Sequence, residues 1–193
     1  MIRRATMIGI MTALLLFTGK VQADDKEHAS EHASEHASEH GSVVIELGAA
    51  GEWSLQHGDS SFGPNVAIEY TAIEHWLEIE VGFTPLFAHG HAELGTDFLL
   101  KKPFELSDNL EFLIGAGPAW VHRTSDEKPT DSVAGEAIIE FVYSPWGEGK
   151  AGFFLEQSYG YDFGKHEQSL GVTAGLHIPI EIQVYPLPQS AMR

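Results

Sequence analysis

The sequence of 193 residues contains no cysteine. Disulfide frameworks, thiolate metal ligands and cysteine nucleophiles are therefore excluded. Positive charge is scarce too, because 11 Lys and Arg stand against 28 Asp and Glu, and the formal net charge is −17. Binding to nucleic acid or to an anionic membrane surface needs a basic face, so we expect no nucleic acid and no polybasic surface contact.

Long hydrophobic runs are also missing. The main apolar stretch covers residues 5–17, which is too short to cross ~30 Å of hydrocarbon as a helix. The basic pair Arg3-Arg4 precedes it and Val21-Gln22-Ala23 follows it, which is the arrangement of a secretory signal peptide. We predict that residues 1–23 direct export and are removed, and that no transmembrane helix follows them.

Residues 27–42 form a tetrapeptide repeat, Glu-His-Ala-Ser three times and then Glu-His-Gly-Ser. No residue in it is both apolar and larger than Ala, so we expect 24–42 to be a disordered His- and Glu-rich tail. Imidazoles four residues apart can share one Zn²⁺, Ni²⁺ or Cu²⁺ ion. We predict weak, exchangeable binding of zinc, nickel or copper, with no obligatory cofactor; a solvated spacer is the alternative. The candidate ligands are His28, His32, His36 and His40.

From residue 43 on, apolar and polar residues alternate with the period of a β-strand, between clusters of Gly, Pro, Asp, Asn and Ser. Leu77, Ile79 and Val81 share one face, for example, and Glu78 and Glu80 share the other. We predict strands at 43–55 (interrupted near 49–51), 65–71, 75–83, 92–101, 109–122, 133–143, 150–161 and 169–178.

Alternation fits both a water-soluble barrel and a transmembrane barrel, whose apolar face is on the outside. Three features favour the membrane. The polar faces are rich in Gly and Glu, aromatic residues such as Trp76 and Trp120 lie near segment ends, and eight strands of about ten residues suit a closed barrel that crosses a bilayer. The predicted fold is all-β, an eight-stranded antiparallel up-and-down transmembrane β-barrel preceded by the disordered repeat.

The stretch from residue 94 to 122 contains Lys-Lys-Pro-Phe-Glu-Leu-Ser-Asp-Asn-Leu-Glu-Phe and Gly-Ala-Gly-Pro-Ala-Trp-Val-His. With this strand-turn-strand pattern, residues 43–178 resemble the small eight-stranded outer-membrane barrels of the OmpA/OmpX-like group. The resemblance implies a lipid bilayer partner and location in the cell outer membrane. Such barrels usually end in an aromatic residue; here the strand meets Pro179, so either it ends at Tyr185 or assembly uses an internal signal. The expected domains are a barrel at 43–185 and a tail at 186–193.

An eight-stranded barrel is nearly filled by its own side chains, so we expect no open pore by default. The predicted interior carries many carboxylates and few cations, mainly Lys101 and Lys150. Gly115 and Gly117 lie within a predicted strand, where they indicate close packing rather than a phosphate loop. No set of nucleophile, base and acid stands out, so we expect no enzyme.

Histidines of the body gather at one predicted end of the barrel, in or beside the connections 56–64, 84–91, 123–132 and 162–168. His89 and His91 are the sharpest pair, because two imidazoles two residues apart can chelate one ion. Ordinary solvated loop residues are the alternative reading. The histidines at this end are His57, His89, His91, His122 and His166.

Three functions fit these patterns. The first is an outer-membrane barrel with a structural, interaction or small-cation-handling role and a periplasmic tail that binds divalent metal ions. The second is a soluble periplasmic barrel that binds an apolar ligand, as lipocalins do. The third is a lipid-modifying outer-membrane enzyme. The lipid bilayer and divalent metal ions are the expected partners of the first.

Overall fold

The structure is a computed structural model that describes residues 42–88, 90–125, 129–147 and 149–180. The predicted signal peptide and the His/Glu repeat therefore lie outside the described residues, apart from Ser42. No helix long and apolar enough to cross a membrane occurs in the described part of the chain. The strands are β1 (Val43–Ser54), β2 (Ser60–Ile73), β3 (Leu77–Ala88), β4 (His91–Ser107), β5 (Leu110–Ser125), β6 (Thr130–Tyr143), β7 (Gly152–Asp162) and β8 (Glu167–Ile180).

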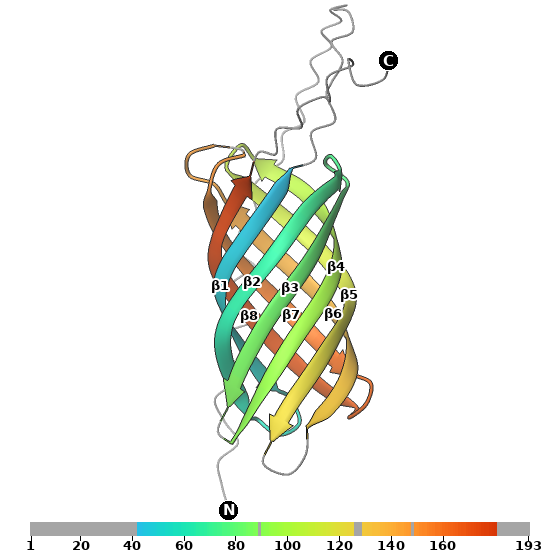
Figure 1. Cartoon of the computed structure of the whole chain (residues 1–193). Helices are drawn as coiled ribbons and strands as arrows, with labels where there is room; N and C mark the ends of the chain where they lie inside the picture. Colours follow the sequence, from blue (N-terminus) through green and yellow to red (C-terminus); the bar gives the residue numbers. More distant parts are fainter. Residues whose placement is uncertain (1–41, 89, 126–128, 148, 181–193) are drawn as a thin grey trace, which may run out of the picture. The chain divides into compact units, whose positions relative to one another are not determined.

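Each strand pairs antiparallel with its neighbour in sequence, and β8 pairs with β1 to close the barrel (Figure 1). The closing register runs from Val43 opposite Ile180 to Ser54 opposite Ser169. The eight-stranded antiparallel up-and-down barrel predicted from the sequence is thereby confirmed. The strands are strongly tilted relative to the barrel axis (Figure 1), as closure of a small barrel requires.

The barrel has two distinct ends. The end that holds Val43 and Ile180, with the connections 74–76, 108–109 and 144–151, is called the terminal end. The opposite end, with the connections 55–59, 89–90, 126–129 and 163–166, is called the loop end.

Most strands are longer than the alternation predicted, and the connections at the loop end are correspondingly shorter. Residues 60–64 and 84–88 were expected in connections but belong to β2 and β3. The first strand is continuous through residues 49–51, where a break was expected. Gly and Pro misled the prediction, because Pro64 and Pro85 sit inside paired strands opposite Ala49 and Leu94.

The last strand contains Pro179, which lies opposite Val44, and it is described as far as Ile180. An extension to Tyr185 lies outside the described residues. Proline cannot donate a ladder hydrogen bond. Pro179 accordingly stands one residue from the end of the described strand, where the loss of a donor interrupts the fewest pairs.

The two faces of the sheet are inverted relative to a water-soluble protein. Large apolar side chains point outward on every strand, among them Ile68, which is 54% exposed, and Val81, which is 51% exposed. Charged side chains are enclosed: Lys101 is 1% exposed and Glu140 is 0% exposed. An apolar outer face around a polar interior is the arrangement expected of a transmembrane barrel.

Close strand packing depends on glycine at a few inward positions. A Cβ atom built on Gly117 of β5 would lie 1.8 Å from the carbonyl oxygen of Phe98 on β4. One built on Gly95 of β4 would lie 3.5 Å from the nearest atom, the carbonyl oxygen of Thr84. The first distance is impossible without backbone movement, and the second is an ordinary contact.

We therefore predict that Gly117→Ala destabilises the barrel by about 1–3 kcal/mol or more, because overpacking against backbone forces strands apart. The matched variant Gly95→Ala should stay within about 0.5 kcal/mol of the wild type. Urea unfolding in detergent micelles, followed by tryptophan fluorescence, measures both. Equal stability of the two variants would contradict this account of the packing.

Candidate functional site

The barrel interior is lined by carboxylates from nearly every strand. Among the described residues, the cations that face this interior are Lys101 and Arg123. Acidic residues greatly outnumber them, so the interior attracts positive charge and repels anions. The inward carboxylates include Glu46, Glu52, Glu69, Glu78, Glu80, Glu93, Asp97, Glu136, Glu140, Glu156 and Asp162.

Lys101 is the centre of one buried ion network. Its Nζ lies 3.1 Å from Glu69 Oε2 and 2.5 Å from Glu140 Oε2, and it also contacts the carboxylate of Glu80. The four side chains come from β4, β2, β6 and β3, so one ammonium group links strands from opposite sides of the barrel. Three carboxylates around one cation leave an excess of negative charge in an enclosed space.

A second polar contact lies across the closing seam. His177 Nδ1 of β8 is 3.0 Å from Glu46 Oε1 of β1, and both side chains are buried. The two residues are direct neighbours in the register of the seam. The same end of the barrel interior also holds an apolar cluster of Leu113, Val142 and Phe154. The terminal end is therefore filled by side chains, partly polar and partly apolar.

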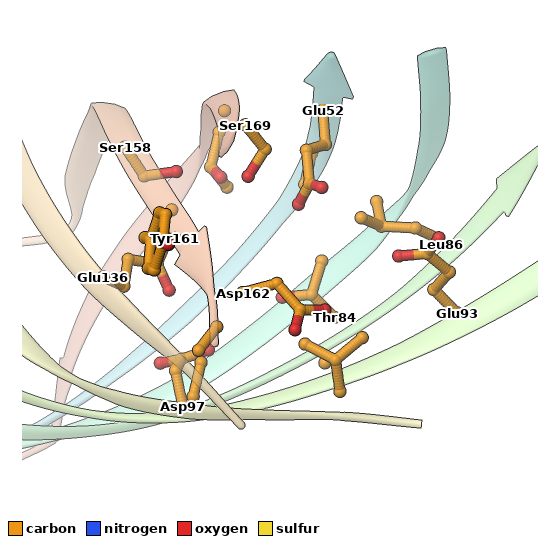
Figure 2. A pocket seen from close by; sticks show the side chains of 18 of the residues that line it. Glu52, Thr84, Leu86, Glu93, Asp97, Glu136, Ser158, Tyr161, Asp162 and Ser169 are labelled. Atoms are coloured by element: carbon orange, nitrogen blue, oxygen red, sulfur yellow. The ribbon is translucent and has the colours of Figure 1, made fainter. Parts of the chain in front are cut away.

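Toward the loop end the interior opens into a cavity of about 120 Å³. Figure 2 shows Glu52, Asp97 and Glu136, from β1, β4 and β6, around this space. A wider hollow of about 730 Å³ continues at the loop end, and Glu52 and Arg123 line both. A cation that enters from this end therefore meets carboxylates on several sides.

Arg123 stands between the cavity and the wider hollow. Its Nε is 2.5 Å from Glu93 Oε1, and its Nη1 is 3.3 Å from Asp162 Oδ2. Asp162 also accepts hydrogen bonds from Ser132 Oγ at 2.7 Å and from the backbone N–H of Gly164 at 2.8 Å. These contacts fix the guanidinium group and join β4, β5, β6 and β7 at the loop end.

The prediction that Lys150 is the second cation of the interior was wrong. Lys150 lies exposed in the connection between β6 and β7, and Arg123 occupies the interior instead. Arg123 was assigned to a connection because β5 was expected to end at His122. The signal was present in the sequence, since Ala119, Val121 and Arg123 continue one face of the strand.

The four described histidines of the predicted rim, His57, His91, His122 and His166, lie at the loop end, but each contacts a different partner. His57 Nε2 is 3.2 Å from Glu167, His91 Nε2 is 3.3 Å from Glu93, and His122 Nδ1 is 2.6 Å from Asp131. Among the described residues of this rim, no three His, Asp or Glu donors lie close enough to share an ion.

His89, His28, His32, His36 and His40 lie outside the described residues. Metal binding by the tail and by the His89–His91 pair therefore stays a prediction.

No protein-family model and no curated protein sequence matches this chain. Solved structures do match it. Neisserial surface protein A superposes with a TM-score of 0.58 at 14% identity, over 72% of this chain and 96% of that one. The outer membrane protein OprG from Pseudomonas aeruginosa has a TM-score of 0.53 at 12% identity, over 74% and 97%. The N-terminal β-barrel domain of Pseudomonas aeruginosa OprF has a TM-score of 0.51 at 14% identity, over 70% and 97%.

These similarities concern the fold. The chain has the eight-stranded barrel fold of small outer-membrane proteins, and the resemblance inferred from its alternating pattern is confirmed at that level.

We predict that Lys101→Met destabilises the barrel by about 3–5 kcal/mol, because it leaves buried carboxylates without their cation. Lys102→Met is the matched control. Lys102 is exposed on the outer face over the rings of Trp76 and Phe104, and its loss should cost about 1 kcal/mol at most. Denaturant unfolding in micelles compares the two. If both variants unfold alike, the Lys101 network does not hold the barrel together.

Proposed function

We propose that this protein is a non-enzymatic outer-membrane β-barrel, exported by the signal peptide at residues 1–23. The main support for this proposal is the apolar outer face, which is continuous around all eight strands. A soluble lipocalin-like barrel would expose that face to water, which soluble monomers avoid over such an area. Exposed aromatic side chains near both ends add support, with Trp76 and Trp146 at the terminal end and Phe62 and Phe87 toward the loop end. Such residues suit membrane interfaces.

The interior supports a cation-handling role rather than passage of large solutes. The cavity at the loop end is acidic, whereas the middle of the barrel is filled by the Lys101 network and the terminal end by the Leu113 cluster. An open channel needs a continuous aqueous path, which side chains of an eight-stranded barrel usually fill. We infer that small cations concentrate at the loop end, and that the barrel also anchors its tail at the membrane.

The tail is proposed to bind divalent metal ions on the periplasmic side. Its four histidines and four glutamates alternate in a short segment, and neutral imidazole binds zinc, nickel and copper well. In the usual topology both termini of such barrels are periplasmic. The tail and the loop end would then lie on opposite sides of the membrane, with no path for metal between them.

The membrane proposal predicts that the mature protein fractionates with the outer membrane and resists extraction by mild detergent. Its migration on SDS gels should also change on boiling, because a closed barrel stays folded in unheated samples. Fractionation and paired gels of heated and unheated samples measure both properties. Recovery of a soluble monomer from the periplasm would favour the lipocalin-like alternative instead.

The tail proposal predicts that the purified full-length protein binds Zn²⁺, Ni²⁺ or Cu²⁺ at micromolar concentrations. Replacing His28, His32, His36 and His40 by Asn should remove most of the bound metal, and the affinity should fall as pH drops through ~6.5, where imidazole protonates. Isothermal titration provides the stoichiometry, and His91→Ala is the control for the rim. Unchanged stoichiometry in the four-Asn variant would make the repeat a spacer only.

A further inference from the structure

Three buried donors converge inside the barrel beside the closing seam. Glu46 of β1, Glu140 of β6 and His177 of β8 each place one ligand atom within 4.8 Å of the others. Their exposures are 2%, 0% and 9%. The group is not a patch of surface acids, because it combines two carboxylates with an imidazole in an enclosed space.

One carboxylate oxygen of Glu140 has no hydrogen-bond partner. Its Oε2 accepts a hydrogen bond from Lys101 Nζ at 2.5 Å, whereas its buried Oε1 has no hydrogen-bond partner. A buried carboxylate oxygen without a partner costs free energy, since it has lost its water and gained nothing. A cation bound at that oxygen would remove this cost.

The neighbouring group of carboxylates shows what such a spacing accommodates. Glu69, Glu80 and Glu140 also lie within 4.8 Å of one another, and the ammonium group of Lys101 sits among them. No Lys or Arg contact serves the Glu46–Glu140–His177 group in the same way among the described residues, apart from the Lys101 bond to Glu140. Counting Glu46, the two groups together hold four carboxylates for one ammonium.

We propose that Glu46, Glu140 and His177 bind one divalent transition-metal ion inside the barrel, separately from the tail. The imidazole nitrogen favours Zn²⁺, Co²⁺ or a similar ion over Mg²⁺ and Ca²⁺, which prefer oxygen ligands alone. Bonds of about 2.0–2.2 Å hold ligand atoms about 3.3 Å apart in a tetrahedral site. Donor atoms that lie within 4.8 Å of one another therefore need to approach by about 1.5 Å at most. Water completes the coordination.

The ion would replace the His177–Glu46 hydrogen bond by bonds to both residues. It would thereby join β1 to β8 across the seam and tie both to β6. Lys101 is a positioning residue in this arrangement, because its bond to Oε2 leaves Oε1 of Glu140 for the metal. Orientation of a ligand carboxylate by a second hydrogen bond is typical of metal sites.

The test uses the full-length chain with His28, His32, His36 and His40 replaced by Asn, refolded into micelles with Zn²⁺ and then dialysed against a weak chelator. One zinc ion per chain should remain by elemental analysis. His177→Gln and Glu46→Gln in this background should each lose it. Glu69→Gln is the matched control, because Glu69 contacts Lys101 but does not belong to the site, and it should retain the ion. His91→Ala should retain it as well.

Gel migration of unheated samples shows whether each variant has folded. If His177→Gln and Glu46→Gln fail to fold, the zinc X-ray absorption spectrum of the folded four-Asn chain decides instead. A single imidazole among oxygen ligands is expected, and two imidazoles or none would overturn the proposal. The proposal is equally overturned if the four-Asn chain retains no zinc. It is also overturned if His177→Gln and Glu46→Gln both retain as much zinc as the Glu69→Gln control. The membrane and tail proposals are unaffected by those results.

Discussion

Closure of the sheet is the constraint on which everything else in this molecule depends. A backbone in lipid has no water to bond to, so a sheet can cross only when its last strand pairs with its first. The β1–β8 pairing meets that requirement over the full length of β1. Closing only eight strands leaves a narrow interior, and alternation then directs every second side chain into it.

The narrow interior brings the charged side chains of the polar face close to one another, so that like charges repel. Glutamates that would be harmless on a soluble surface face one another across the barrel, where the effective dielectric constant is low. Lys101 and Arg123 both reduce the repulsion between these carboxylates, but at different places. Lys101 is enclosed and contacts three carboxylates near the middle of the barrel, whereas Arg123 lies at the open cavity and joins strand ends. The interior carboxylates that Lys101 and Arg123 do not neutralise make the interior attractive to other cations.

The period-two alternation was enough to predict the number of strands, their faces and the inversion, because each residue's side is settled locally. Strand ends were harder, since Pro64, Pro85 and Gly63 look like turn residues but serve close packing within paired strands. Separate errors at the end of β5 and the start of β7 assigned Arg123 to a connection and Lys150 to the interior. Glu46, Glu140 and His177 each lie within one of the segments that the alternation predicts as strands. Their meeting could not be predicted, because it depends on closure and on the stagger between strands.

The seam between β1 and β8 has a consequence for how the barrel forms. Every other strand pair is a hairpin of sequence neighbours with a short connection, and such local pairs form early. The seam joins the two ends of the domain, so its loop-closure entropy is lost last and at greatest cost. Its centre is also tightly packed, because a Cβ on Gly175 would lie 2.2 Å from the carbonyl oxygen of Leu47. Until the seam closes, the chain is an open sheet with two unpaired edges, and this interval is when it is most exposed to edge-to-edge aggregation.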